Sequence, residues 1–407
     1  MKILLIGGDG FCGWPTSLRL SSIGHEVLIV DDLSRRRIDE ELEVSSLTPI
    51  ESIQERCNAW HELTGKSIFF KHFCIGEDLI ALERLIGEYQ PDTIIHFAEQ
   101  RSAPYSMRSS LHRHSTIMRN IGATHHILMA LVSLQLDAHV IHLGTLGVYD
   151  YNCVNGVTLP DGYIKAALGE EQESTEILFP TKPSSIYHVT KSVDQLLFQF
   201  YNQNDGLRIT DLHQGIVWGT QTEETKIDDR LINRFDYDGN YGTVLNRFLM
   251  QAVVGHPLTI YGLGTQKRAF VHISDTVDCI VRAVDSPPEF GERVCIMNQV
   301  SEIHRIVDLA NIVSGITSAR ISFLMNPRPE IENNELRVRT DALQRLGFKP
   351  TMLSEGLLEE VTDIARRHAN RCDKGKILPD VIWNAERRAA IQAEAFPSGQ
   401  QFLNHPI

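Results

Sequence analysis

The chain has 407 residues, of which 42% are hydrophobic and 22% charged, and its formal net charge at pH 7 is −13. This composition is typical of a globular protein long enough for one large domain or two modest ones. The acidic excess argues against a nucleic-acid partner, and no apolar run approaches the roughly 18 residues of a membrane span, so we predict neither nucleic-acid nor membrane binding. The seven cysteines are scattered without C-x-x-C pairs or metal-ligand spacing, so we expect reduced thiols, a cytoplasmic location and no metal site.

The first predicted strand, residues 2–6, runs directly into the sequence Gly7-Gly8-Asp9-Gly10-Phe11-Cys12-Gly13. In this spacing the first glycine permits a tight turn, the second lets backbone amides approach a pyrophosphate, and the third allows close packing of the following helix. The N-terminus of that helix faces the phosphates with the positive end of its dipole. We therefore predict that Gly7, Gly10, Phe11, Cys12 and Gly13 bind a dinucleotide.

A second apolar run, residues 27–30, ends at Asp31, with Asp32 next to it. An acidic residue at this position suits the ribose hydroxyls of NAD, which is the cofactor we predict. Arg35 and Arg36 follow in the sequence, and an arginine here also suits the 2′-phosphate of NADP. The choice between the two cofactors stays open at this point, and all four side chains are candidate cofactor contacts.

The remaining N-terminal half alternates strands with helices. Residues 33–66 are polar and read as an insertion with helical pieces. Further strands are expected at 67–70, 93–97, 139–143 and 209–213, and helices at 77–89 and 116–134. This alternation predicts an α/β fold, a Rossmann-type doubly wound parallel sheet that binds ligands at the carboxyl ends of its strands. The segments expected at that edge are Gly7–Gly13, Asp31, Ala98–Arg101 and Thr145.

The predicted chemistry is carried by Tyr187 and Lys191, which are four residues apart and share one face of a helix. An ammonium beside a phenol favours the phenolate and brings the tyrosine pKa towards the range of a general base. Lys191 can also hold the nicotinamide ribose. Thr145, at the end of the fifth strand, is placed to hydrogen-bond the same substrate oxygen.

This combination resembles the extended short-chain dehydrogenase/reductase family, in which NAD oxidises a sugar hydroxyl. A closer resemblance is to the UDP-sulfoquinovose synthases. The motifs that carry it are Gly10-Phe11-Cys12-Gly13-Trp14, Glu99-Gln100-Arg101-Ser102-Ala103-Pro104-Tyr105-Ser106-Met107, Asp236-Tyr237-Asp238, Leu245-Asn246-Arg247-Phe248, Gly255-His256-Pro257-Leu258-Thr259 and Asn326-Pro327-Arg328. The resemblance implies that NAD takes the C4 hydride of UDP-glucose, water leaves across C5–C6, sulfite adds at C6 and the hydride returns.

The resemblance also implies roles for individual residues. Tyr187 would deprotonate O4, with Lys191 and Thr145 assisting it. Ile75 and Ala98 would contact the cofactor, and Arg101 would meet the cofactor, the sulfite or the sugar-side phosphate. The remaining substrate-binding residues implied by the family are His188, Gln214, Thr243, Asn246, Arg247, Arg268 and Arg328, the last two as the clamp on the diphosphate. The partners implied are a UDP-hexose, sulfite and a second copy of the chain in a homodimer.

Several positions depart from the synthase pattern at slots expected to face the ligands. Val148 stands where the synthases carry glutamate, Cys74 stands where they carry aspartate, and Arg119 and His213 each replace an asparagine. These departures keep a second interpretation open, a UDP-sugar 4-epimerase or dehydratase without the sulfite step. A third interpretation, a non-catalytic sensor on the same fold, is opposed by the intact Tyr187–Lys191 pair.

The family pattern predicts two units. Residues 1–220 form the NAD-binding Rossmann domain, to which 268–289 return, and residues 221–267 and 290–407 form a smaller C-terminal lobe that binds the nucleotide sugar. Within the lobe, residues 220–242 are rich in charge and read as a mobile flap over the substrate or as a solvated loop.

Overall fold

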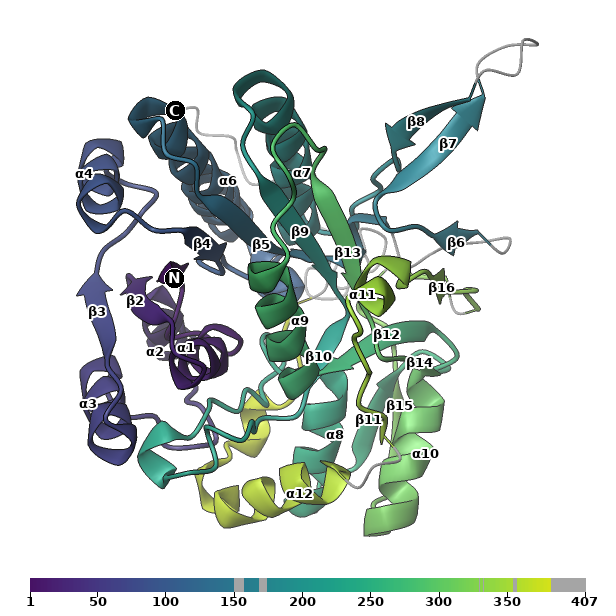
Figure 1. Cartoon of the computed structure of the whole chain (residues 1–407). Helices are drawn as coiled ribbons and strands as arrows, with labels where there is room; N and C mark the ends of the chain where they lie inside the picture. The colour runs from purple at the N-terminus through teal and green to yellow at the C-terminus, as the bar shows by residue number, and fades with distance from the viewer. Residues whose placement is uncertain (150–156, 168–173, 329, 332, 354–356, 382–407) are drawn as a thin grey trace, which may run out of the picture.

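The computed structural model describes residues 1–149, 157–167, 174–328, 330–331, 333–353 and 357–381. Its centre is a parallel sheet of seven strands in the order β13-β9-β5-β4-β1-β2-β3 (Figure 1). The strands are β1 (Lys2–Ile6), β2 (Glu26–Asp31), β3 (Ile68–His72), β4 (Thr93–His96), β5 (His139–Thr145), β9 (Ile209–Gln214) and β13 (Cys295–Gln299). The predicted doubly wound α/β fold is thereby confirmed.

Helices cover both faces of this sheet, because successive residues of each strand point to opposite sides. Ile3 and Leu5 pack in one apolar cluster with residues of α1 (Gly13–Ser22), α3 (Ile53–Thr64) and α9 (Ile273–Asp285). Leu4 and Ile6 pack in another with residues of α4 (Leu79–Tyr89), α6 (Ser110–Leu134) and α7 (Ile186–Asp205). The predicted insertion after β2 contains α2 (Ser34–Leu42) and α3, and the short α5 (Ala103–Ser106) follows β4.

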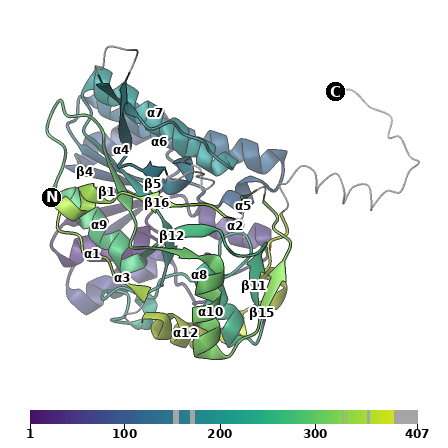
Figure 2. The same ribbon diagram turned by 90° about the vertical axis from the view of Figure 1, so that its right-hand side faces the viewer.

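The C-terminal lobe is built around two small sheets. One contains β10 (Ile216–Trp218), β12 (Lys267–His272) and β14 (Glu302–Arg305), and the other contains β11 (Leu258–Tyr261) and β15 (Ile321–Leu324). Three helices, α8 (Val244–Val253), α10 (Ile306–Thr317) and α12 (Leu357–Arg367), share one apolar cluster with them. In Figures 1 and 2 these helices lie together at the end of the molecule away from α4, α6 and α7.

Several smaller elements accompany these. The strand pairs are β6 (Thr158–Leu159) with β16 (Arg337–Val338) and β7 (Tyr163–Ala167) with β8 (Ser174–Leu178), and the remaining α-helix among the described residues is α11 (Asp341–Arg345). None of the helices in the described residues is long and apolar enough to cross a membrane.

The predicted boundary at residue 290 is wrong for one element. β13 lies within the range assigned to the lobe, but it is the edge strand of the central sheet and pairs in parallel with β9. Ile296 and Met297 are buried, one on each face, in the two main apolar clusters of the sheet. The chain therefore leaves the central sheet after β9, builds part of the lobe and returns to complete the sheet.

Candidate active site

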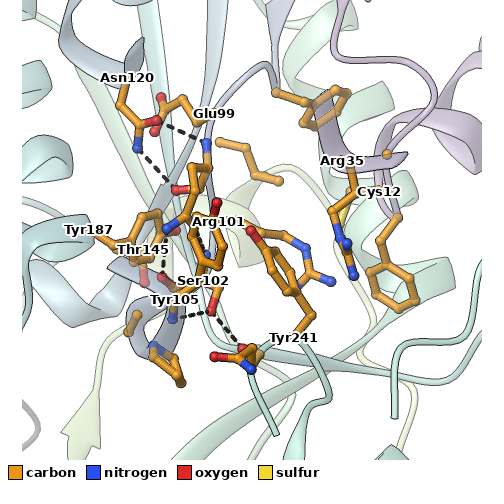
Figure 3. A pocket seen from close by; sticks show the side chains of 18 of the residues that line it. Cys12, Arg35, Glu99, Arg101, Ser102, Tyr105, Asn120, Thr145, Tyr187 and Tyr241 are labelled. Atoms are coloured by element: carbon orange, nitrogen blue, oxygen red, sulfur yellow. Dashed lines mark hydrogen bonds between the residues drawn. The ribbon is translucent and has the colours of Figure 1, made fainter. Parts of the chain in front are cut away.

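A cavity of about 590 Å³ lies at the carboxyl edge of the central sheet, between the sheet and the lobe. Residues of the glycine-rich turn line one side and four arginines of the lobe line another. The predicted site residues that it brings together are Gly7, Gly10, Phe11, Cys12, Gly13, Asp31, Asp32, Arg35, Ile75, Ala98, Arg101, Thr145, Tyr187, His188, Lys191, Gln214, Thr243, Arg247, Arg268 and Arg328. Figure 3 shows part of this cavity, with Thr145 and Tyr187 beside each other.

The turn after β1 leaves no room for side chains at two of its glycines. Gly7 has φ of +91°, and a Cβ there would lie 2.7 Å from the backbone nitrogen of Ala98. A Cβ on Gly13 would lie 2.2 Å from the carbonyl oxygen of Gly7. The first turn of α1 therefore packs directly on the β1 turn, which forms a backbone cradle of the shape that a dinucleotide pyrophosphate needs.

The two acidic residues after β2 are held by different partners. The carboxylate of Asp31 accepts hydrogen bonds from the backbone nitrogens of Asp9 at 2.9 Å and Leu33 at 2.7 Å. Burial raises the pKa of Asp31 to about 6. Asp32 forms ion pairs with Arg37 and with Arg119, which also lines the cavity. Both carboxylates line the cavity.

The structure does not bring Arg36 into the cavity. Its Nε and Nη2 atoms donate to the two carboxylate oxygens of Asp9, at 2.6 and 2.9 Å. Asp9 also pairs with the buried Arg56 at 3.0 Å. A fully buried carboxylate requires such partners, which explains why the guanidinium turns towards Asp9.

The helix that carries Tyr187 and Lys191 begins where the sequence places a good cap. The Ser185 side chain accepts from the backbone nitrogen of His188 at the N-terminus of α7, which ends at Gly206 with φ of 70°. The Nζ atom of Lys191 lies 6.0 Å from the ring centroid of Tyr187 and donates to the carbonyl oxygen of Leu143 at 2.6 Å. The phenol and the ammonium therefore face the cavity from one side of one helix.

Glu99, which the sequence indicates only as part of a motif, is a member of this site. Its carboxylate lies 2.8 Å from Nζ of Lys191, and both side chains are almost fully buried. Burial alone would lower the pKa of Lys191, but the Glu99 carboxylate outweighs it, so the pKa lies above its usual value. Atoms of Glu99, His142 and Asp194 lie within 4.8 Å of one another, but the ammonium of Lys191 already provides the cation of this cluster.

On the lobe side, Asn246 does not reach the cavity. Its side chain accepts from the backbone nitrogen of Gly219 at 3.0 Å and is buried. Arg268 pairs at 2.8 Å with Glu330, a cavity-lining carboxylate that our sequence analysis missed. Burial raises the pKa of Glu330, but Arg268 and Arg328 outweigh it and hold that pKa below its usual value. Glu330 thus keeps a negative charge between two of the predicted phosphate ligands.

Two of the departures from the synthase pattern do not face the cavity. Val148 is buried in an apolar cluster with Leu146 and Leu159. His213 is fully buried, and its ring contacts Asp211 at 2.9 Å and the Tyr149 hydroxyl at 2.7 Å. The expectation that these two slots are exposed to ligands is therefore wrong, whereas Cys74 and Arg119 do line the cavity.

The predicted flap is also wrong over much of its length, because residues 231–239 are all buried. The Asn233 side chain donates to the carbonyl oxygen of Phe11 at 2.9 Å, and the Phe235 carbonyl accepts from the backbone nitrogen of Leu47 at 2.9 Å. This segment is packed between the glycine-rich turn and the insertion. The charges of Arg234 and Asp236 are neutralised by ion pairs inside the protein, whereas Glu223, Asp229 and Arg230 are exposed.

Asp236 is the centre of that neutralisation. It pairs with Arg101 at 2.5 Å, Arg35 at 3.0 Å and Arg234 at 3.1 Å. Burial raises the pKa of Asp236, but these three guanidinium groups outweigh it and hold that pKa well below its usual value. Three cavity-lining arginines are thus held in place by one carboxylate from the segment 231–239.

Replacing Asp236 by Asn is expected to lower the free energy of unfolding by about 3 kcal/mol at neutral pH, because it breaks a buried ion pair on one side. Since the folded pKa is depressed, this stabilisation is fully present above the ordinary aspartate value of about 4 and is lost as the pH falls through the folded pKa. Urea unfolding of both proteins should show a large difference at pH 7 that narrows below pH 4. A difference that does not change with pH would contradict this account.

With this geometry established, the relatives of the chain define its class. The chain belongs to the NAD dependent epimerase/dehydratase family, whose model matches residues 3–296. UDP-sulfoquinovose synthase from Spinacia oleracea, a chloroplastic protein, is 40% identical over 94% of this chain and 79% of its own length. UDP-sulfoquinovose synthase from Sulfolobus acidocaldarius is 34% identical over 94% of this chain and 98% of its own. Within the family the chain therefore groups with the UDP-sulfoquinovose synthases.

Solved structures agree on the fold. UDP-glucose 4-epimerase from Thermotoga maritima superposes with a TM-score of 0.67 at 20% identity, covering 90% of this chain and 99% of that one. UDP-glucuronic acid 4-epimerase from Bacillus cereus, in complex with UDP-glucuronic acid and NAD, gives 0.65 at 22% identity over 90% of this chain and 99% of that one.

Proposed function

We propose that this protein is an NAD-dependent UDP-sulfoquinovose synthase that joins sulfite to UDP-glucose. One observation carries the proposal: three groups of residues line the same cavity. They are the glycine-rich cradle, the set of Tyr187, Lys191 and Thr145, and the arginines Arg268 and Arg328. The identity to two synthases along 94% of the chain supports the same assignment.

The residues present fit NAD. Gly7 and Gly13 leave the backbone free to approach a pyrophosphate, and Asp31 and Asp32 lie where the adenosine ribose would bind. Ile75 and Ala98 also line the cavity and would contact the cofactor, and Lys191 would hold the nicotinamide ribose. When bound, NAD would supply the acceptor for the hydride that leaves C4, and its reduced form would supply the hydride that returns there.

The protein's own groups would then handle binding and protons. Tyr187 would take the proton from O4, with the Lys191 ammonium favouring the phenolate and the Thr145 hydroxyl bonding the same oxygen. Arg268 and Arg328 would bind the diphosphate, since guanidinium groups match phosphate geometry, and Arg247, Gln214, His188 and Thr243 line the space for the sugar. Arg101 would meet sulfite or the sugar-side phosphate.

A second candidate function is a UDP-sugar 4-epimerase or dehydratase without the sulfite step. One observation favours it: Val148 occupies the slot where a carboxylate is expected in the synthases, and it is packed in an apolar cluster. Valine cannot transfer a proton, so any elimination or addition step would need another group.

Products made by the purified protein separate the two candidates. It would be incubated with UDP-glucose and NAD, with and without sulfite, and the products identified by mass. A sulfonated UDP-sugar that forms only with sulfite is the expected result. UDP-galactose or a dehydrated keto-sugar made without sulfite would replace the proposal by the second candidate.

We also propose a homodimer formed through α6 and α7, which lie side by side. Leu111 on α6 is 78% exposed, and Leu196 and Phe200, on one face of α7, are 62% and 56% exposed. Leu196 and Phe200 are four residues apart on α7, so they present two neighbouring apolar side chains to such an interface. Light scattering should show a dimer that Leu196→Glu converts to a monomer, whereas Ile316→Glu, at an exposed site on α10, should not.

A cytoplasmic location stays a prediction from cysteine usage. All six cysteines that the structure describes are free thiols, which suits a reducing compartment.

A further inference from the structure

A row of ionisable side chains crosses the central sheet beneath the helix that carries Tyr187. The strand register places His96 of β4 beside His142 of β5, and His142 beside Asp211 of β9. All three are at most 1% exposed. Parallel sheets covered on both faces are ordinarily apolar at such positions, so packing alone does not explain this row.

The row connects Lys191 to a distant tyrosine by contacts of hydrogen-bond length. Glu99 lies 2.8 Å from Lys191 and 2.9 Å from Nε2 of His142. The Nδ1 atom of His142 lies 2.8 Å from one oxygen of Asp211, whose other oxygen lies 2.9 Å from Nε2 of His213. The chain ends at the hydroxyl of Tyr149, 2.7 Å from Nδ1 of His213.

This row reaches the cavity at one end only. Lys191 lines the cavity, whereas Tyr149, at the other end of the described contacts, is 3% exposed. A connected set of buried charges of this kind fixes electrostatics and geometry.

The His142 ring contacts both Glu99 and Lys191, whose Nζ lies 2.9 Å from Nε2 of His142. Burial and Lys191 lower the pKa of His142, but Asp211 and Glu99 outweigh them and raise it to about 9. Burial raises the pKa of Glu99, but Lys191 outweighs it and lowers the pKa to about 2. The two carboxylates, Glu99 and Asp211, thus flank the His142 ring, and Glu99 also contacts the Lys191 ammonium.

The groups that face Lys191 come from several elements. They are Glu99 after β4, His96 on β4, His142 on β5, and Tyr187 and Asp194 on α7. Burial and the Glu99 carboxylate raise the pKa of Asp194 to about 8, so it is mainly protonated at neutral pH. Glu99 is therefore the one full negative charge in direct contact with the ammonium among these groups.

The backbone of β5 accommodates the row. A Cβ on Gly144 would lie 2.4 Å from a carboxylate oxygen of Asp211 and 2.9 Å from the ring of His213. Only glycine at this position leaves both side chains in place between β5 and α7.

We propose that Glu99 is a positioning residue that holds the ammonium of Lys191 towards Tyr187 and keeps it protonated, with His142, Asp211 and His213 fixing Glu99 from behind. The inference deepens the proposed function, because it assumes that Lys191 assists Tyr187. It does not depend on which UDP-sugar is used or on the sulfite step.

Replacing Glu99 by Gln keeps the shape of the side chain and removes the charge. Without the carboxylate the pKa of Lys191 falls, so the alkaline limb of the kcat–pH profile should move to lower pH by one unit or more. NAD affinity, measured by calorimetry, should fall as the pH rises from 7 to 9.5 in Glu99→Gln while it stays nearly constant in the wild type. Glu99→Asp, which keeps the charge, should return the alkaline limb part of the way to its wild-type pH. A uniform loss of activity with the limb unmoved would overturn the proposal.

Phe198→Leu is the matched control, because the Phe198 ring packs against that of His142 at 4.8 Å between centroids without carrying charge. It should lower stability and leave the position of the limb unchanged.

A second measurement keeps the proposal testable if Glu99→Gln does not fold. Nitrogen-15 NMR of the histidine rings in the wild type, assigned with His142→Gln, should show His142 doubly protonated up to about pH 9. A neutral His142 at pH 7 would overturn the proposal. If no UDP-sugar is turned over, the NMR and NAD titrations still decide it, so its failure is distinct from failure of the proposed function.

Discussion

Tyr187→Phe is expected to lower kcat for the conversion of UDP-glucose about 1,000-fold, within the range of 10²- to 10⁴-fold that a positioned acid–base group contributes. The phenol ring is kept, so the packing of α7 is unchanged, while the only group on this face of the helix able to take the O4 proton is removed. Product formation by mass spectrometry and the appearance of enzyme-bound NADH absorbance would both be measured. Both should fall together.

Tyr201→Phe is the matched control on the same helix. Its hydroxyl contacts His125 at 3.0 Å, away from the described cavity, so activity should be unchanged. NAD affinity and thermal stability should be close to wild type in both variants. Retention of full activity in Tyr187→Phe would show that another group takes the proton and would remove the catalytic assignment.

Gly13→Ala is expected to abolish tight NAD binding. The new methyl group would lie 2.2 Å from the carbonyl oxygen of Gly7 and 2.8 Å from the Cα of Gly8. Both neighbours are backbone and cannot rotate away, so α1 must move from the turn after β1. Overpacking of this kind costs about 1–3 kcal/mol, and about 3 kcal/mol at the cradle would weaken NAD binding roughly 100-fold. Calorimetric titration with NAD would measure the change.

Gly122→Ala serves as the control, because a Cβ there meets nothing within 4 Å. It lies inside α6, where alanine is favoured over glycine by up to about 1 kcal/mol, so this variant should bind NAD normally and unfold at a slightly higher temperature. An unchanged NAD affinity in Gly13→Ala would mean that the pyrophosphate does not bind at this turn.

The parts of the fold that sequence reasoning predicted are those set by local patterns. The strand at 2–6, the glycine spacing that follows it and the four-residue interval between Tyr187 and Lys191 are each encoded within a few residues. Their spatial meeting follows from the rule that parallel strands present their carboxyl ends at one edge. Most of the predicted cofactor residues accordingly line one cavity.

What could not be predicted depends on pairs far apart in the chain. Arg36 turns away from the cavity because Asp9 and Arg56 form an ion cluster with it, and Asp236 meets Arg101 from 135 residues away. Glu99 gains its role only when Lys191 and His142 are brought to it by the fold. A signal for the buried row was present, since His96, His142 and Asp211 are ionisable residues within strands of the central sheet.

The late arrival of β13 has a consequence for how the chain is made. The edge of the central sheet at β9 stays unpaired until residues 295–299 have been synthesised. Part of the lobe lies between β9 and β13 in the chain and is therefore made first. A ribosome-bound chain that stops near residue 220 therefore carries an open strand edge, which is a site for pairing with other chains. The two units should mature together at the end of translation, and a fragment consisting of residues 1–220 should aggregate where the full chain stays in solution.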